Sequence, residues 1–550
     1  MAPVPFQHPV RYAPLAVVGA QLTSIVYLTY AIGASLYTSY KSLGPAQDTR
    51  SRLAQRKRLI PAFLGLAFVA LGLATYTSVT SAILSYKTWA YEHGLDHPES
   101  FIPDEELVLE PESSNELNYV YIAHWLSDTS IYHDALEIVA EKARRFWWGQ
   151  QIDLATVAFG MLLSIEGRRR NIPLTSAFLA LAHLVNLSFA QNLFYLALLL
   201  TPSPLPSGDE DLELPVAPVP TSKIIEIRDR YFPSKPKNWY LHPFILLSTL
   251  ALNYTSISLL PYAAGTSSFV NVVLISRAST FLPLILPAVV PISWGTVQSR
   301  PHDAYGSFTT LFRTISAASF ALQAKASLAG LFYNVPDSHY HRHSVFFPWD
   351  VEERTTWERS TTALGKVLGS ISDHPAVQAV GWDALLCTLS LGIWAAVRAT
   401  DVQDIIKSAI PSFKFYRNVE QAVPDQTRDV SVKTESEPAE DLGSEHSMTL
   451  RRRGRPTKSA FGSIMSSSSP SEGTPVTPGR KRGRPRKSKQ PEEEKAYEPT
   501  PSEAGELVEG DVLPASELDW ESAALAWGLV AFAGLGSACA GVFGGECISR

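Results

Sequence analysis

Cysteine is scarce in this 550-residue chain, which has three: Cys387, Cys539 and Cys547. All three lie in or beside apolar segments, and none belongs to a CxxC pair. This pattern excludes a disulfide framework and a zinc site of the CxxC type. The N-terminus also lacks the basic region, the short apolar region and the cleavage site of a secretory signal. We therefore expect residues 12–40 to be retained as a first membrane span.

Charge is absent over long stretches of the chain and concentrated in others, although the net charge is only −6. Apolar runs that reach the roughly 20 helical residues needed to cross a bilayer recur up to about residue 400. The pattern predicts an all-α, polytopic transmembrane helical bundle of about seven to nine spans over residues 1–400. The expected spans are Tyr12–Tyr40, Leu59–Tyr86, Phe146–Ile165, Ile172–Leu200, Leu241–Ala263, Phe269–Trp294, Tyr305–Val335 and Val377–Val397.

Residues 87–145 interrupt the apolar pattern. The first half of this segment is acidic, and the second half mixes Tyr, Trp and His with other polar residues. Because Tyr and Trp favour the headgroup region of a bilayer, we expect an extramembrane segment whose second half lies on the membrane surface at the mouth of the bundle.

Basic residues set the expected orientation of the spans. The loop after the first span is rich in Lys and Arg, and the corner Glu166–Arg170 holds three arginines. Short basic loops mark the cytoplasmic side, so the N-terminus is predicted to be outside or lumenal. Seven spans then leave the C-terminal tail in the cytoplasm or nucleoplasm, and eight leave it in the lumen. Charges and prolines within Phe269–Trp294 and Tyr305–Val335 leave both counts open.

Residues 401–516 are rich in Ser, Pro, Glu, Lys and Arg and poor in large apolar residues. Such a segment buries too little apolar surface to offset its ordering entropy, which predicts a disordered tail. Residues 517–550 follow as a separate C-terminal segment. Their apolar run, Ala523–Phe543, is rich in Gly and Ala, and we expect it to form a helix that spans the membrane or docks in it.

Two basic motifs in the tail, RRRGRP and KRGRPR, resemble the AT-hook. An Arg-Gly-Arg-Pro core lies extended in the narrow minor groove of A·T-rich DNA, where the enhanced negative potential attracts arginine. The alternative is a basic low-complexity tail that serves as a nuclear localisation signal or contacts anionic lipid. The DNA-binding residues that the resemblance implies are Arg453, Gly454, Arg455, Pro456, Arg482, Gly483, Arg484 and Pro485.

Polar residues within the expected spans are the candidate catalytic site, because ionisable and polar groups in a bilayer face a bundle interior or a wet cavity. An ionised Asp at the centre of a span costs about 2.5–3.5 kcal/mol on insertion scales. The spacing of the polar residues in Ile172–Leu200 predicts one helix face turned toward Asp153. The alternative is that these groups only hydrogen-bond neighbouring helices. The candidates are Asp153, His183, Asn186, Gln191 and Asn192.

Alternating histidines at His339, His341 and His343 would share one face of a strand. No carboxylate or Cys stands beside them at a recognised ligand spacing. We therefore expect an interfacial histidine cluster, and neither a metal nor another cofactor is predicted.

The stretch Phe146–Pro202, especially SIEGRRRNIP and NLSFAQNLFYLALLLTP, resembles fungal multi-pass membrane proteins of biosynthetic clusters. It is similar to membrane-bound terpene cyclases of the ascofuranone meroterpenoid type. The resemblance implies acid-initiated cyclisation of an isoprenoid chain or its epoxide. Within this hypothesis the polar residues of the spans supply the candidates: Asp153 as the acid, and Asn186 and Gln191 to orient the substrate. The sequence has no DDxxD motif, so ionisation of a diphosphate by Mg²⁺ is not supported.

The predicted function is thus a membrane enzyme of secondary metabolism that resides in the endoplasmic reticulum, with the lipid bilayer and a lipophilic small molecule as its partners. A second reading is a nuclear-envelope protein that tethers DNA through its tail. A third is a transporter, since polar groups within the membrane also line substrate paths, although the hydropathy shows no inverted repeat.

Overall fold

The computed structural model describes residues 10–42, 50–93, 122–201, 235, 239–297, 304–337, 340–342, 351–398, 402–411 and 518–548. The chain divides into two units, residues 1–413 with 499–550, and residues 414–498. The second unit, which holds both AT-hook-like motifs, lies outside the described residues.

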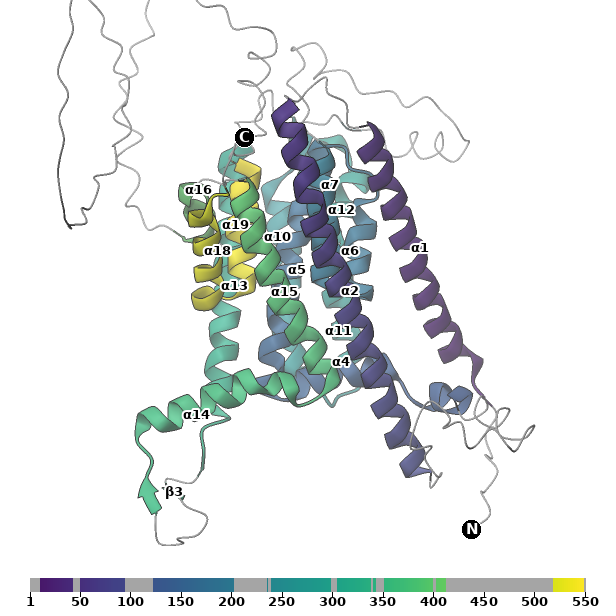
Figure 1. Ribbon diagram of the computed structural model, residues 1–550, viewed down its shortest axis with the longest axis vertical. Helices are drawn as coiled ribbons and strands as arrows, with labels where there is room; N and C mark the ends of the chain where they lie inside the picture. Colours follow the sequence, from purple (N-terminus) through teal and green to yellow (C-terminus); the bar gives the residue numbers. More distant parts are fainter. Residues whose placement is uncertain are drawn as a thin grey trace, which may run out of the picture. The chain divides into compact units, whose positions relative to one another are not determined.

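Helices make up most of the described chain, and two short antiparallel strand pairs accompany them (Figure 1). The strand pairs are β1 (Trp239–Leu241) with β2 (Gly295–Val297), and β3 (Tyr340–Arg342) with β4 (Val351–Glu353). The α-helices are α1 (Tyr12–Ser42), α2 (Arg50–Glu92), α4 (Ile131–Glu141), α5 (Ala143–Arg169), α6 (Thr175–Leu184), α7 (Leu187–Leu200), α10 (Pro243–Ala263), α11 (Phe269–Ser279), α12 (Leu282–Val289), α13 (Tyr305–Phe332), α14 (Thr356–Gly369), α15 (Pro375–Arg398), α16 (Val402–Ala409), α18 (Trp520–Ala533) and α19 (Leu535–Ile548).

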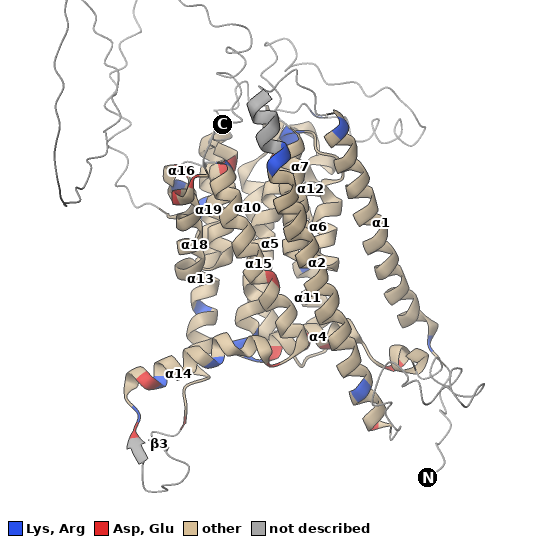
Figure 2. Cartoon of the chain, in the orientation of Figure 1, with Lys and Arg blue, Asp and Glu red and all other residues tan. Residues whose placement is uncertain are grey.

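Five of the described helices are long and apolar enough to cross a membrane, namely α1, α2, α10, α13 and α15. The pair α11–α12, which bends by 60°, makes a sixth if it counts as one span. This confirms a helical bundle of the multi-pass membrane type. Figure 2 shows the same segregation, with Lys, Arg, Asp and Glu sparse along the helices and more frequent near their ends.

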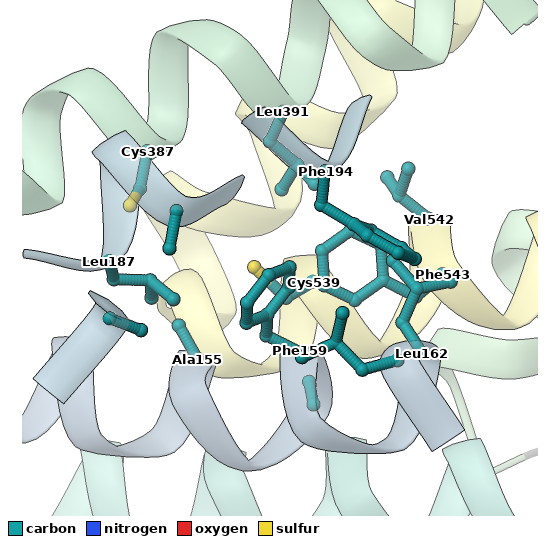
Figure 3. Close-up of a cluster of buried hydrophobic side chains, with 14 of the residues drawn as sticks. Ala155, Phe159, Leu162, Leu187, Phe194, Cys387, Leu391, Cys539, Val542 and Phe543 are labelled. Carbon is teal, nitrogen blue, oxygen red and sulfur yellow. The ribbon is translucent and has the colours of Figure 1, made fainter. Parts of the chain in front are cut away.

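Helix α5 lies at the centre of the bundle and packs against α6, α10, α13, α15 and α19. Its residues Ala155, Phe159 and Leu162 are fully buried. They pack in one apolar core with Phe194 of α7, Cys387 of α15 and Cys539 of α19, as Figure 3 shows. The three cysteines are free and buried.

The predicted span Ile172–Leu200 is wrong, because this segment forms two short helices, α6 and α7, with a break at Val185 and Asn186. Both ends of the pair lie beside the end of α5. The Ile172 N–H donates to the Gly167 carbonyl at 2.7 Å, and Arg170 donates to the carbonyls of Leu198 at 3.1 Å and Thr201 at 2.8 Å. The pair is therefore a hairpin that enters and leaves at the end of the bundle holding Arg168–Arg170, the arginine end.

The hairpin is too short to cross a bilayer. Helices of 10 and 14 residues rise about 15 and 21 Å at 1.5 Å per residue, less than a hydrocarbon core of about 30 Å. Hydropathy alone cannot distinguish such a hairpin from one long span, since both arms are apolar.

The predicted helix Ala523–Phe543 is likewise two helices, α18 and α19, joined at Gly534, whose φ of 86° ends α18. The Asp519 N–H donates to the Ala396 carbonyl at 3.1 Å, which places the start of α18 beside the end of α15. The Leu535 N–H donates to Gln151 Oε1 at 3.3 Å, so the tip reaches the middle of the bundle. This C-terminal hairpin is docked in the bundle and does not span it.

Residues 402–409, expected at the start of the disordered tail, instead form α16. This helix packs against α13 and α19, and the Ser316 hydroxyl donates to the Ala409 carbonyl at 2.5 Å. Gly544 of α19 allows the contact, since a Cβ there would lie 2.5 Å from Ser408 Cβ. The sequence did not predict this helix because α16 is too short and too polar to resemble a span.

Candidate functional site

The tip of the α6–α7 hairpin is held by Asn186 in the middle of the bundle. Asn186 is the N-cap of α7, and its Oδ1 accepts the Phe189 N–H at 3.0 Å. Its Nδ2 donates to the Ala70 carbonyl of α2 at 3.1 Å. One side chain thus satisfies the start of α7 and fixes the tip to a neighbouring helix.

Asp383 of α15 closes the same helix end from the other side. Its Oδ2 accepts the Leu187 N–H at 3.0 Å, and its Oδ1 accepts the Ser188 N–H at 2.7 Å. The first N–H groups of a helix have no partner within it, and the helix dipole favours a negative charge there. The sequence shows Asp383 as an interruption of an apolar span, but its role could not be read because Leu187 is 196 residues away.

A second group of polar side chains surrounds the end of α6. His183 Nε2 lies 2.8 Å from Thr280 Oγ1, in the break between α11 and α12. Arg277 of α11 donates to the His183 carbonyl at 3.4 Å. Arg277 also interacts electrostatically with Asp153 of α5 and with His183. Asp153, His183, Arg277 and Thr280 are called the Asp153 cluster below.

Within this cluster Asp153 is half-buried and hydrogen-bonds to no residue that the structure describes. Arg277 is also only partly buried, so the cluster is not sealed by packing. The sequence predicted Asp153 and His183 for the site. It did not predict Arg277, which was noted only as a charge within the expected span Phe269–Trp294. It also did not predict Thr280, because a threonine in an apolar segment is not conspicuous.

Gln191 and Asn192 do not join the cluster as predicted. Both are fully buried, and their hydrogen bonds stay within α7: Gln191 donates to Tyr195 Oη at 2.5 Å and Asn192 donates to the Ser188 carbonyl at 2.8 Å. Tyr195 stacks on Trp394 of α15 with ring centroids 4.4 Å apart. The predicted single polar stripe is therefore wrong, because the break before α7 separates His183 from these amides.

The arginine end holds a buried network of charges rather than an exposed corner. Glu166 accepts hydrogen bonds from Arg169 at 2.7 Å and Arg170 at 3.0 Å. Glu546 of α19 accepts two from Arg398 of α15, at 2.8 and 3.0 Å, and lies 3.6 Å from Arg170. The network therefore connects α5, α15 and the C-terminal helix, and its acids are committed to structure.

The described residues contain no group of three His, Cys, Asp or Glu that could hold a metal ion. Of the predicted histidine cluster, His341 lies in β3, while His339 and His343 lie outside the described residues. Comparison of the chain with protein-family models, with curated proteins and with solved structures gives no match. The geometry of the Asp153 cluster is thus the main guide to function.

Proposed function

We propose that this chain is an integral membrane enzyme that acts on a lipophilic substrate, with Asp153 as the proton donor. One observation carries the proposal. Glu166, Asp383 and Glu546 all accept hydrogen bonds from the protein, whereas Asp153 has no hydrogen bond to a described residue. An ionisable group held in a membrane bundle without such a partner is expensive, which favours a functional role.

The surrounding groups suit acid catalysis. A carboxylic acid positioned against a substrate protonates an alkene carbon or an epoxide oxygen, and the resulting carboxylate takes a proton back when the product cation collapses. Arg277 stabilises that carboxylate. The ring of Phe281 lies 5.6 Å from that of His183, so an aromatic face is present for a developing cation. The resemblance of Phe146–Pro202 to membrane-bound terpene cyclases supports an isoprenoid substrate and acid-initiated cyclisation.

Replacement of Asp153 in microsomes tests the reaction. We expect Asp153→Asn to lower formation of cyclised product from a farnesylated phenol or its epoxide by about 10²–10⁴-fold, the usual contribution of a general acid. The control is Asp134→Asn, which alters a half-exposed carboxylate at the start of α4, outside the Asp153 cluster. Full activity of Asp153→Asn would contradict the proposal. Wild-type protein that carries these compounds across proteoliposomes without converting them would favour the transporter.

We also propose seven membrane crossings, made by α1, α2, α5, α10, α11–α12, α13 and α15. Helix α5 has 27 residues, a length of about 40 Å, and the two hairpins return to the end they enter. Seven crossings put the N-terminus and the tail on opposite sides. Lys41 and Arg168–Arg170 favour a cytoplasmic arginine end, and with it a cytoplasmic tail, in the endoplasmic reticulum. Protection of an epitope in the tail from protease in sealed microsomes would contradict this topology.

This topology favours a second candidate, a nuclear-envelope protein that tethers A·T-rich DNA. A tail on the cytoplasmic and nucleoplasmic side would reach DNA with the motifs at 453–456 and 482–485. Replacing Arg455 and Arg484 by Ala should then abolish retention on A·T-rich duplex and leave the membrane location unchanged. Equal retention on G·C-rich duplex would show only phosphate binding and would contradict the tether.

A further inference from the structure

A cavity of about 670 Å³ lies where α4, α5, α10 and α13 meet, around the first residues of α5. It is therefore at the end of the bundle opposite the arginine end and is distinct from the Asp153 cluster. Part of its wall is apolar, formed by Phe146, Pro261 and Leu322 among others. Its volume falls in the range of about 300–1,000 Å³ that is usual for small-molecule sites.

The polar part of the wall carries excess positive charge. It contains Lys142, Arg144 and Lys325 against one acid, Glu141. Arg144 is paired with Asp373 at 2.8 Å. Lys142 and Lys325 have no carboxylate partner among the described residues. Lys325 Nζ lies 4.9 Å from the ring centroid of Tyr262, which also lines the cavity.

The wall of this cavity also includes a residue with a buried, unpaired donor. Gln150 is 3% exposed and lines the wall, and its Nε2 has no hydrogen-bond partner among the described groups. A buried N–H that is left unsatisfied carries the full cost of its desolvation. An acceptor atom of a ligand placed beside Gln150 would satisfy this donor.

From these observations we propose that the cavity binds an amphiphile with one anionic head group, a phosphate or a carboxylate, and a hydrocarbon chain. Lys142 and Lys325 attract the anion, Gln150 donates to one of its oxygens, and the apolar wall covers the start of the chain. Charge-assisted bonds of this kind are stronger than neutral ones. The proposal does not depend on the reaction at Asp153. Asp153 lies three residues after Gln150 on α5.

Binding to the purified full-length protein tests the assignment, with oleoyl lysophosphatidic acid as the probe and native mass spectrometry as the readout. We expect one equivalent to bind, with monooleoylglycerol and inorganic phosphate each binding at least about tenfold more weakly. Lys325→Gln and Gln150→Leu should each weaken the lipid by about tenfold or more. The matched control, Lys366→Gln on the exposed side of α14, should leave it unchanged.

Three results would overturn the proposal. Equal affinity for monooleoylglycerol would show that the anion is not recognised, and equal affinity for inorganic phosphate would show that the chain is not recognised. Unchanged lipid affinity in both variants, with melting temperatures equal to that of the wild type, would place the lipid elsewhere. Asp153→Asn should bind the probe normally, so failure of the proposed reaction and failure of this site are distinguishable.

Discussion

Glu546 and Arg398 form two hydrogen bonds, at 2.8 and 3.0 Å, although 148 residues separate them. Both side chains are buried, at 2% exposure each. The pair joins α19 to α15, the last described helix of the chain to the last long one before the tail. Removing one partner of a buried ion pair is strongly destabilising, because the other charge then stays buried without compensation.

Removal of one partner should therefore destabilise the bundle strongly. We expect Glu546→Ala to lower the free energy of unfolding by about 3–5 kcal/mol, because Arg398 is then buried without its carboxylate. Asp404→Ala breaks a pair with the half-exposed Lys407 and should cost less than about 1 kcal/mol. Denaturation in detergent, followed by circular dichroism, measures both variants. Equal losses of stability in the two variants would show that the buried pair stabilises the protein no more than the exposed one.

The length of the apolar runs made α1, α2, α10, α13 and α15 predictable, because crossing a bilayer requires a minimum helix length. The hairpin turns at Asn186 and Gly534 were not predictable in this way. Both arms of each hairpin are apolar, and the reversal depends on contacts with distant helices, such as that of Asn186 with Ala70.

The candidate site was predictable only in part, for a related reason. An Asp in an apolar helix is conspicuous, so the sequence alone makes Asp153 a candidate. Its electrostatic partner Arg277 and the neighbour Thr280 belong to α11 and the break after it, far along the chain, and only the fold brings them together. Gln191 and Asn192 were placed on one stripe with His183 because an unbroken helix was assumed, and the break between α6 and α7 separates them.

The C-terminal hairpin should stay in the bundle after the tail is cut. Cys539 and Phe543 of α19 are fully buried, and Glu546 adds its ion pairs, so the hairpin is held without the covalent link. We insert a protease site within residues 414–498, cleave the purified protein and test whether the C-terminal fragment co-elutes with an N-terminal tag. We expect co-elution for the wild type and loss of the fragment for Glu546→Ala. Release from the wild type would contradict the docking.

Asn186 and Asp383 both hold the start of α7, but they should contribute differently to the free energy of unfolding. Asn186→Ala removes an N-cap and should cost about 1 kcal/mol. Asp383→Ala should cost about 3 kcal/mol or more, because two buried N–H groups, those of Leu187 and Ser188, lose a charged acceptor. Thermal unfolding of both single variants and of the double variant gives the coupling between them. A smaller loss of stability for Asp383→Ala than for Asn186→Ala would contradict the prediction that Asp383 contributes more.

Two glycines of the C-terminal hairpin form a matched pair for testing its packing. A Cβ at Gly544 would lie 2.5 Å from Ser408 Cβ and 3.0 Å from Phe312 Cβ, whereas a Cβ at Gly528 meets nothing within 4 Å. We expect Gly544→Ala to cost about 1–3 kcal/mol through overpacking of α19 against α16 and α13. Gly528→Ala should be neutral or stabilising by up to about 1 kcal/mol, because Ala favours the helix.

The melting temperatures of the two glycine variants in one detergent give the comparison. If the hairpin lay loosely on the bundle, both glycines would respond only to helix propensity and both variants would gain stability. A lower melting temperature for Gly544→Ala and a higher one for Gly528→Ala require that α19 packs tightly against α16 and α13. They also require that the part of α18 around Gly528 has room for a methyl group.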